Sequence, residues 1–548
     1  MLSYTSKHVS TLSKDDSDLS SHGATTVRWG RYLPTIAQLP TELFTSVLHL
    51  ALPCVDLTSC QEAYTSRLYM RALYIIRRAS RHWQDVVDGT LSFWTVVLST
   101  LPPHVNNATI LRSATLPLTV VYEYSSERNI HGHPSSRAFY RSIAHTRARW
   151  SALILDISGD GDMPEYLADP APLLQTVIVR SSSREELDIE PLEMLGGQTE
   201  NLRYVAISVA SIRWKMGLFT QLKALHLTSI RQNLTVSHVV DFARASPSLE
   251  ELSIGGALEL AASRISPLII TLLHLKSIEL ECSDIRATEY ILQHIRAPSC
   301  IKFAVYIGEE DEHDVSRFVH ETLKPFQDIL RRIHIENGAS EMAVKTWEFD
   351  WRSRTEGDGD RGFTIKIETY FPMGIHWVEE VLQREGGVQV RFYYGAALNN
   401  AIMRDIAMMR CATSVVVGAQ WAGRLDQFFQ LLCQPLSPDT HVPPLPNLRA
   451  FSIPSTGWVL QDLLDMVQLR RTIFSEGRVE QPPLRINIRV DMWDRKLGLP
   501  TIPDLVNLTK IKGVEGVEGV RFLGPPEGQD GMIGVVWNEE ASAPTWGQ

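Results

Sequence analysis

The side chains best suited to chemistry lie in two short acidic segments, residues 156–162 and 350–360. Both are rich in Asp and Gly, and carboxylate oxygens are ligands that Ca²⁺ prefers. Neither segment has the ligand order of an EF-hand, and neither is followed by a Glu placed to bind the ion with both oxygens. Solvated turns explain these segments better, so we predict no metal site.

The motifs of common enzymes are absent from the sequence. There is no phosphate-binding glycine loop and no Gly-x-Ser-x-Gly elbow. His320-Glu321 begins a zinc-protease motif, but Lys324 stands where the second His is needed. The six cysteines form no CxxC pair and no zinc-site spacing; they are Cys54, Cys60, Cys282, Cys300, Cys411 and Cys433. We therefore expect no catalytic residue, no cofactor and reduced thiols.

The composition is that of a folded protein, and the overall charge is not that of a nucleic-acid-binding protein. The 548 residues are too many for one hydrophobic core, and 44% of them are hydrophobic. The formal net charge of −10 lacks the basic footprint of a nucleic-acid binder. Residues 67–81 are locally basic, with five arginines. We interpret this segment as a solvated helix face or a contact for an acidic protein.

No segment is predicted to enter or cross a membrane. Residues 1–30 are rich in Ser, Thr and Asp, contain no apolar core of a signal peptide, and read as a disordered tail. The richest apolar run, residues 265–275, is too short for a membrane span and is interrupted by Pro267. The predicted location is the cytoplasm or the nucleus.

A short apolar unit recurs from about residue 150. It has the form apolar-x-x-apolar-x-apolar, and helical segments such as residues 239–243 and 290–295 stand between copies. Copies begin about 20 to 30 residues apart, the period of leucine-rich repeats. They are Trp150/Leu153/Leu155, Leu174/Val177/Val179, Leu202/Val205/Ile207, Leu222/Leu225/Leu227, Leu249/Leu252/Ile254, Leu275/Ile278/Leu280, Cys300/Phe303/Val305 and Leu330/Ile333/Ile335.

This period predicts an α/β solenoid, an irregular leucine-rich-repeat horseshoe in which each strand shares its core with its neighbours. The alternative is an ordinary α/β domain, whose parallel strands would be near-continuous Val, Ile and Leu runs. Beyond residue 340 the pattern is less regular. We predict a hairpin over residues 347–367, further strands at 388–392, 446–453 and 484–490, and helices near 425–432 and 463–467.

The predicted organisation has five parts. Residues 1–30 form a disordered tail, 31–98 a small all-α module, and 99–340 the solenoid. Residues 341–510 continue as irregular repeats with a hairpin insertion, and 511–548 form a flexible tail. Within the module we predict helices from Leu39-Pro40 to Leu52-Pro53 and over 67–88, then an extended segment over 91–98.

The module resembles an F-box. Leu39-Pro40-Thr41-Glu42-Leu43, followed by Val47-Leu48, is similar to the opening F-box helix. Residues 79–86, with Trp83 after a cationic residue, resemble the later helix, and Phe93-Trp94 resembles the closing aromatic pair. Residues 55–68 would be an enlarged first loop, as in many fungal F-box proteins. The repeats that follow resemble the divergent leucine-rich arrays that accompany F-boxes.

The resemblance implies a substrate-recognition subunit of an SCF-type (cullin–RING) ubiquitin ligase. Leu39, Pro40, Leu43 and Val47 match F-box positions that contact a Skp-type adaptor, and Trp83 and Trp94 match later motif positions. An alternative for both Trp residues is that they only pack the core of the module. The solenoid would hold an unknown protein substrate, and neither nucleic acid nor a membrane is an expected partner.

Two other interpretations remain open. The chain is a leucine-rich scaffold outside any ubiquitin ligase, with the helical module as a cap for the array. Alternatively it is an enzyme or small-molecule receptor with a pocket in the repeats, although no motif indicates its chemistry.

Overall fold

A computed structural model gives the fold of the chain. It describes residues 39–53, 62–123, 135–157, 164–181, 194–208, 214–215, 217–230, 234–256, 258–260, 268–282, 284–308, 312–338, 340–344, 349–353, 362–367, 372–382, 387–392, 400–417, 425–432, 444–454, 460–477, 482–489, 510–511, 513–514 and 517–523. The predicted tail over residues 1–30 lies outside these residues.

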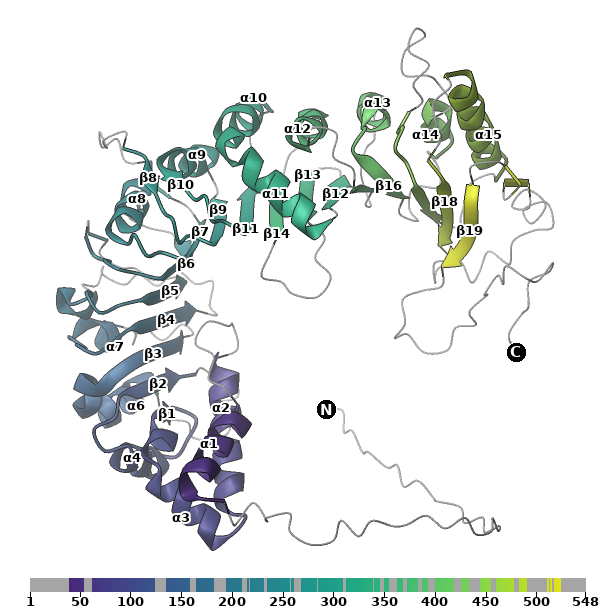
Figure 1. Cartoon of the computed structure of the whole chain (residues 1–548). Coiled ribbons are helices and arrows are strands. Elements are labelled where there is room, and N and C mark those ends of the chain that lie inside the picture. Colours follow the sequence, from purple (N-terminus) through teal and green to yellow (C-terminus); the bar gives the residue numbers. More distant parts are fainter. Residues whose placement is uncertain are drawn as a thin grey trace, which may run out of the picture.

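The described strands build one open, mixed and mostly parallel sheet of 17 strands that curves without closing (Figure 1). Nine strands follow one another in chain order: β1 (Val96–Leu98), β2 (Leu118–Tyr122), β3 (Trp150–Ile157), β4 (Thr176–Ser181), β5 (Tyr204–Ser208), β6 (Ala224–Ile230), β7 (Glu251–Gly256), β9 (Ser277–Cys282) and β11 (Lys302–Ile307). Between them, β8 (Ile270–Thr271) and β10 (Ile295–Arg296) form a separate parallel pair.

The chain order reverses next to β11. The strand beside it is β14 (Gly362–Ile367), followed across the sheet by the antiparallel β13 (Phe349–Ser353) and then β12 (Ser340–Val344). Parallel pairing in chain order then resumes. It continues through β15 (Val388–Phe392), β16 (Ala412–Val417), β17 (Ala450–Pro454), β18 (Leu484–Arg489) and β19 (Val517–Leu523).

Most of the helices lie along the convex side of the sheet, outside the arc in Figure 1. The helices between β1 and β11 in the chain are α4 (Pro103–Arg112), α6 (Ser136–Ile143), η3 (Ala144–Arg149), α7 (Pro164–Ala168), η4 (Met194–Gly197), α8 (Val236–Ala245) and α9 (Ile285–His294). The helices after β11 are α10 (Glu312–Arg317), the π-helix η5 (Phe318–Thr322), η6 (Lys324–Phe326), α11 (Gln327–Asn337), α12 (Pro372–Leu382), α13 (Asn400–Met408), α14 (Leu425–Leu432) and α15 (Leu460–Gly477).

Local sequence explains where several of these helices begin and end. The Thr235 side chain accepts a hydrogen bond from the His238 amide and caps α8, and Asp284 caps α9 in a similar way. Gly338 ends α11 in the left-handed conformation, with φ of 70°, which glycine adopts without a steric penalty. Gly338 therefore lets the chain turn out of α11 towards β12.

The main core lies between the sheet and the convex helices. The apolar residues of each repeated unit point into it, as Leu153, Val177, Val205, Leu225 and Leu252 show in adjacent strands. Side chains alternate between the two faces of a strand, so the residues between them face the concave side. The strands predicted between residues 150 and 306 are confirmed, and their apolar side chains share one core.

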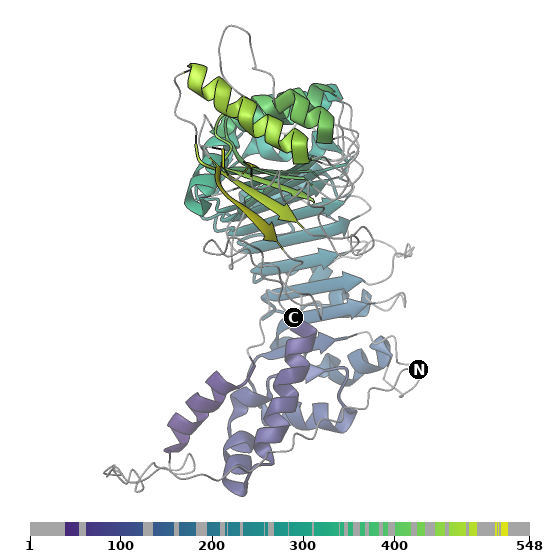
Figure 2. The same ribbon diagram turned by 90° about the vertical axis from the view of Figure 1, so that its right-hand side faces the viewer.

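The N-terminal module consists of α1 (Thr41–Ala51), α2 (Glu62–Arg77), α3 (Arg81–Gly89) and the 3₁₀ turn η2 (Leu91–Trp94). It lies at the lower end of the arc, where α2 approaches the first strands from the concave side (Figures 1 and 2). Figure 2 shows the strands stacked above it. The module and β1–β4 share a second core, which contains Leu73, Trp94, Val121, Ile154 and Ile178.

Several predicted elements are wrong in detail. The helix predicted over residues 67–88 begins earlier and splits at residues 78–80, because the Ser80 side chain accepts the Trp83 amide and starts a new helix. Part of the predicted loop 55–68 is therefore helical, and residues 54–61 lie outside the described part. The segment predicted as extended over 91–98 begins with the turn η2 and becomes a strand only at Val96.

Two further corrections concern the repeat itself. The unit Leu330/Ile333/Ile335 belongs to α11 and not to a strand, because its spacing also fits one side of a helix. Residues 517–523, predicted as flexible, form β19 and pair with β18. The hairpin is confirmed by β13 and β14. The strands predicted at 388–392, 446–453 and 484–490 are confirmed as β15, β17 and β18, although β17 begins only at Ala450, and the helices predicted near 425–432 and 463–467 are confirmed as α14 and α15.

Candidate functional site

Helix α1 presents an apolar stripe to solvent. Leu43, Val47 and Leu50 follow one another at helical spacing and are 56%, 44% and 89% exposed. We call these three residues the docking stripe. On the neighbouring face of the same helix, Phe44 and Leu48 are buried in the second core. The helix is thus apolar on two sides, of which the structure covers only one.

Aromatic contacts hold α1 against the rest of the module at both ends. The Phe44 ring lies edge-on to Trp83 with 5.0 Å between ring centroids. Near the other end the His49 ring lies 4.5 Å from Phe93, and its Nε2 is 3.1 Å from Ser92 Oγ. These contacts fix the direction in which the docking stripe points.

The other residues predicted to bind a partner lie close to α1 but differ in exposure. Pro40 is exposed, and its carbonyl accepts a hydrogen bond from the Phe44 amide at 2.9 Å. Leu39 and Trp83 are half-buried and pack against the second core. Leu43 and Val47 therefore offer the most apolar surface of the predicted set.

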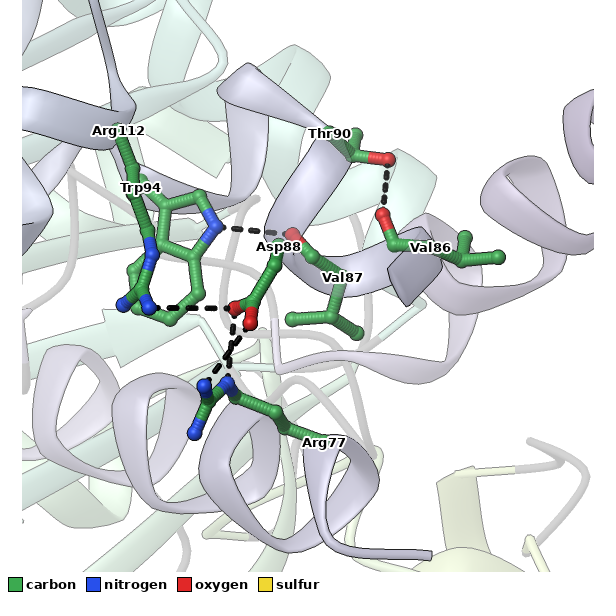
Figure 3. A network of polar contacts seen from close by, with 7 residues as sticks. All are labelled: Arg77, Val86, Val87, Asp88, Thr90, Trp94 and Arg112. Atoms are coloured by element: carbon green, nitrogen blue, oxygen red, sulfur yellow. Dashed lines mark hydrogen bonds and ion pairs between the residues drawn. The ribbon is translucent and has the colours of Figure 1, made fainter. Parts of the chain in front are cut away.

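Trp94 is fully buried, so the prediction that it contacts a partner is corrected. Its indole nitrogen donates to the Val87 carbonyl at 2.8 Å, and the guanidinium carbon of Arg112 lies 4.4 Å from the ring centroid (Figure 3). The side chain has no surface to present to another protein. It packs the core of the module, which was the alternative interpretation for this residue.

A charged network surrounds Trp94 (Figure 3). Both oxygens of Asp88 accept hydrogen bonds from Arg77, at 2.8 and 2.9 Å, and Arg112 lies 3.7 Å from the same carboxylate. Burial disfavours the ionised acid, but the hydrogen bond from Arg77 and the charges of both arginines outweigh it and lower the pKa of Asp88. The network joins α2, α3 and α4.

Sequence reasoning did not assign Leu50 and Leu91 to the site. Leu91 is an exposed leucine in η2, which the contact between His49 and Ser92 places beside the end of α1. The helical spacing of Leu50 from Val47 was the available signal. The position of Leu91 required the fold, because it depends on how η2 returns to α1.

The side chains of the concave face change from apolar to polar along the sheet, away from the module. Adjacent strands place Ile154, Ile178, Ala206, His226 and Ser253 in one row of that face. The first two are covered by the module, whereas His226 and the strands beyond it offer polar side chains. Beyond the module this row is therefore polar, with His226 partly exposed and Ser253 buried.

A side-chain hydrogen bond on this face links two neighbouring strands. His226 Nε2 lies 3.1 Å from a carboxylate oxygen of Glu251, and that hydrogen bond lowers the pKa of Glu251. The pair shows that polar side chains on the concave face lie close enough to act together.

Within the described residues, no cluster of His, Cys, Asp and Glu could hold a metal ion. The predicted solvated turns begin at Asp156 and Asp350 in strands, and most of their remaining residues lie outside the described part. Burial raises the pKa of the Cys282 thiol to about 11 and that of Cys300 to about 12, so neither is a reactive thiolate. Across the described helices, none combines the length and apolar character needed to span a bilayer.

Comparison with known proteins adds no relative: the chain matches no family model and no curated protein.

Proposed function

We propose that the chain is the substrate-recognition subunit of an SCF-type (cullin–RING) ubiquitin ligase. The N-terminal module, as an F-box, would dock on a Skp-type adaptor, and the array would hold the substrate. The observation that carries the proposal is the exposed docking stripe of Leu43, Val47 and Leu50 on an anchored helix. An apolar helix face of this kind is suited to burial in the groove of a partner.

The physical gain from docking is apolar burial. Covering the remaining surface of each stripe residue contributes on the order of 1 kcal/mol. Leu91 is a further exposed leucine of the module, and its neighbour Ser92 contacts His49 of α1. Because the contacts of Phe44 and His49 already order α1, little conformational entropy is lost when the partner binds.

The curved sheet supports an interpretation as an irregular leucine-rich-repeat solenoid. Beyond the strands covered by the module, strands recur with helices on the convex side, and apolar positions of successive units form one continuous core. Such arrays use the extended concave surface for binding. The polar part of the concave face, beyond the strands covered by the module, would contact the substrate.

The mechanism would be proximity. A receptor that binds adaptor and substrate together raises the effective concentration of the substrate beside the conjugating enzyme. It needs no catalytic residue or cofactor of its own, which agrees with the motifs missing from the sequence.

The test is binding of the purified full-length chain to a Skp-type adaptor, measured by calorimetry. We expect binding by the wild type and a loss of at least about a hundredfold in affinity for the double variant Leu43→Asp, Val47→Asp. Leu111→Asp is the matched control, because Leu111 is an exposed leucine on another helix, α4. Unchanged melting temperatures would show that the variants fold.

Failure of the wild type to bind the adaptor would reject the ligase function. Equal binding by the wild type and the stripe variant would reject the docking stripe as the interface.

A specific observation favours a second candidate, a leucine-rich scaffold whose helical module serves as a cap. The module covers Val121, Ile154 and Ile178 of the first strands, and terminal units of an array need such cover. This candidate predicts that removing residues 39–94 unfolds the first strands while no adaptor binds. Adaptor binding by the wild type would support the ligase function and contradict the scaffold.

A further inference from the structure

A groove of about 500 Å³ lies between β10 and the beginning of α11. Its floor consists of Ala297, Phe326 and Ile329, which belong to the core on the helix side of the sheet. The exposed residues Pro298 and Pro325 form part of its rim. The groove is therefore apolar at its base and open away from the concave face and the docking stripe.

Two arginines line this groove, and we call it the arginine groove. Arg332 donates to the carbonyls of Pro298 and Cys300, at 3.2 and 2.5 Å. Arg296 donates to the carbonyl of Ile295 at 3.2 Å. Neither arginine forms an ion pair with an acidic side chain among the described residues. Backbone carbonyls orient both guanidinium groups but do not neutralise their charge.

The groove has a single acidic side chain, on its outer rim. Asp328 is almost fully exposed, and its closest basic partner is Arg331 at 3.9 Å. Because solvent screens an exposed carboxylate, it offsets little of the positive charge deeper in the groove. The interior thus combines an apolar base with an excess of positive charge.

An exposed aliphatic segment supplies one edge of the groove. Thr271 lines it, and the same segment carries Leu268, Ile269 and Leu273, which are all more than half exposed. Buried positions in this segment, such as Leu272, already anchor it to the core. Apolar side chains gathered on an anchored segment beside a groove are typical of a protein-binding surface.

We propose that the arginine groove and this aliphatic segment bind a short acidic and apolar segment of a partner protein. A bulky apolar side chain would fill the base over Phe326 and Ile329, and a neighbouring carboxylate would meet Arg296 and Arg332. Arginine pairs with carboxylates through charge-assisted hydrogen bonds, which are stronger than those between neutral groups. A second apolar residue of the partner would cover Leu273.

The positive charge of the arginine groove favours an acidic segment over a basic or a purely apolar one. A basic segment would bring like charge to both arginines, and a purely apolar one would leave them without a carboxylate. The inference does not depend on the proposed ligase function, because the groove shares no residue with the docking stripe or the concave face.

The experiment selects short random peptides, displayed on phage, against the immobilised full-length chain. Enriched peptides are synthesised, and their affinities are measured by fluorescence anisotropy. We expect enrichment of sequences in which Asp or Glu stands beside Leu, Ile or Phe. Replacing the acidic residues of a selected peptide by Lys should abolish its binding.

Two variants locate the site. Leu273→Asp should weaken binding of the selected peptides by about tenfold or more, and Arg296→Gln should weaken binding of acidic peptides most. Leu173→Asp is the matched control: Leu173 lies in the corresponding turn before β4 and is 48% exposed, compared with 61% for Leu273. Thermal melting confirms that each variant is folded.

The proposal is overturned if no acidic and apolar sequence is enriched. It is also overturned if the folded variants Leu273→Asp and Arg296→Gln bind the selected peptides as tightly as Leu173→Asp does.

Discussion

At the scale of single residues, the module depends on one carboxylate held between two cations. Asp88 accepts hydrogen bonds from Arg77, and Arg112 adds its charge while lying over the Trp94 ring. Each of the three charged side chains is less than a third exposed. Removing the carboxylate would leave two guanidinium groups close together without compensation.

We predict that Asp88→Asn lowers the free energy of opening of α3 by about 2 kcal/mol at pH 7. Native-state hydrogen exchange of the α3 amides measures this quantity. Asp85→Asn is the control, because Asp85 lies exposed on the same helix. An equal effect of both substitutions would show that the network does not stabilise the module.

The same network predicts a pH dependence. The pKa of Asp88 is lower in the folded protein than the ordinary value of 3.8, so its ionised form is stabilised by folding. That contribution is complete above pH 3.8 and is lost as the pH falls through the lower folded value. The difference between wild type and Asp88→Asn should therefore shrink when hydrogen exchange is measured near pH 3. A constant difference would contradict this.

At the scale of elements, the first strands differ from the later ones because both of their faces are covered. Ile154 and Ile178 lie beneath the module, whereas positions in the same row farther along, such as Ser253 and Thr364, carry polar side chains. The module and the first strands therefore depend on each other for apolar burial.

We predict that Ile178→Asp separates the module from the sheet. A carboxylate buried without a partner costs several kcal/mol, so amides in α2 should lose protection from hydrogen exchange. Thr364→Asp, in the same row of the sheet but partly exposed, should leave α2 unchanged. Equal protection of α2 in both variants would show that the second core does not hold the module.

The strands were predictable because each repeated unit presents three apolar residues to one core, as Leu222, Leu225 and Leu227 do. The second core was overlooked, although the sequence carries a signal for it. Leu153-Ile154-Leu155 and Val177-Ile178-Val179 are continuous apolar runs, which indicate strands covered on both faces. The repeat pattern drew attention to the outer residues of each run and not to the middle one.

Other parts were beyond the sequence for physical reasons. The exposed helix face of Leu43 and Val47 could be predicted from spacing, but the burial of Trp94 depends on how Val87 and Arg112 meet around it. The arginine groove joins segments that are separated by about 25 to 60 residues along the chain, so no local pattern identifies it.

At the scale of the whole molecule, the sheet remains open and continuous from β1 to β19 (Figure 1). Contacts link mainly neighbouring strands and helices, so the fold extends along an arc rather than around a centre. A compact chain of this length would have a radius of gyration of about 24 Å.

We predict a radius of gyration well above about 24 Å in small-angle X-ray scattering, with an asymmetric distance distribution. A variant without residues 1–38 and 524–548 is the control for the contribution of the chain ends. A value close to 24 Å for that variant would contradict the open arc.

The reversal next to β11 has a consequence for synthesis on the ribosome. As the chain emerges, each strand of the large sheet from β2 to β11 can add to a strand of that sheet made before it; β8 and β10 form their own pair. The neighbour of β11 is β14, which is made only after β12 and β13. Growth of the sheet must therefore wait until Ile367 has left the exit tunnel, and the edge of β11 stays uncovered by a strand during that interval. A chaperone that covers the free edge of β11 would act during this interval of synthesis.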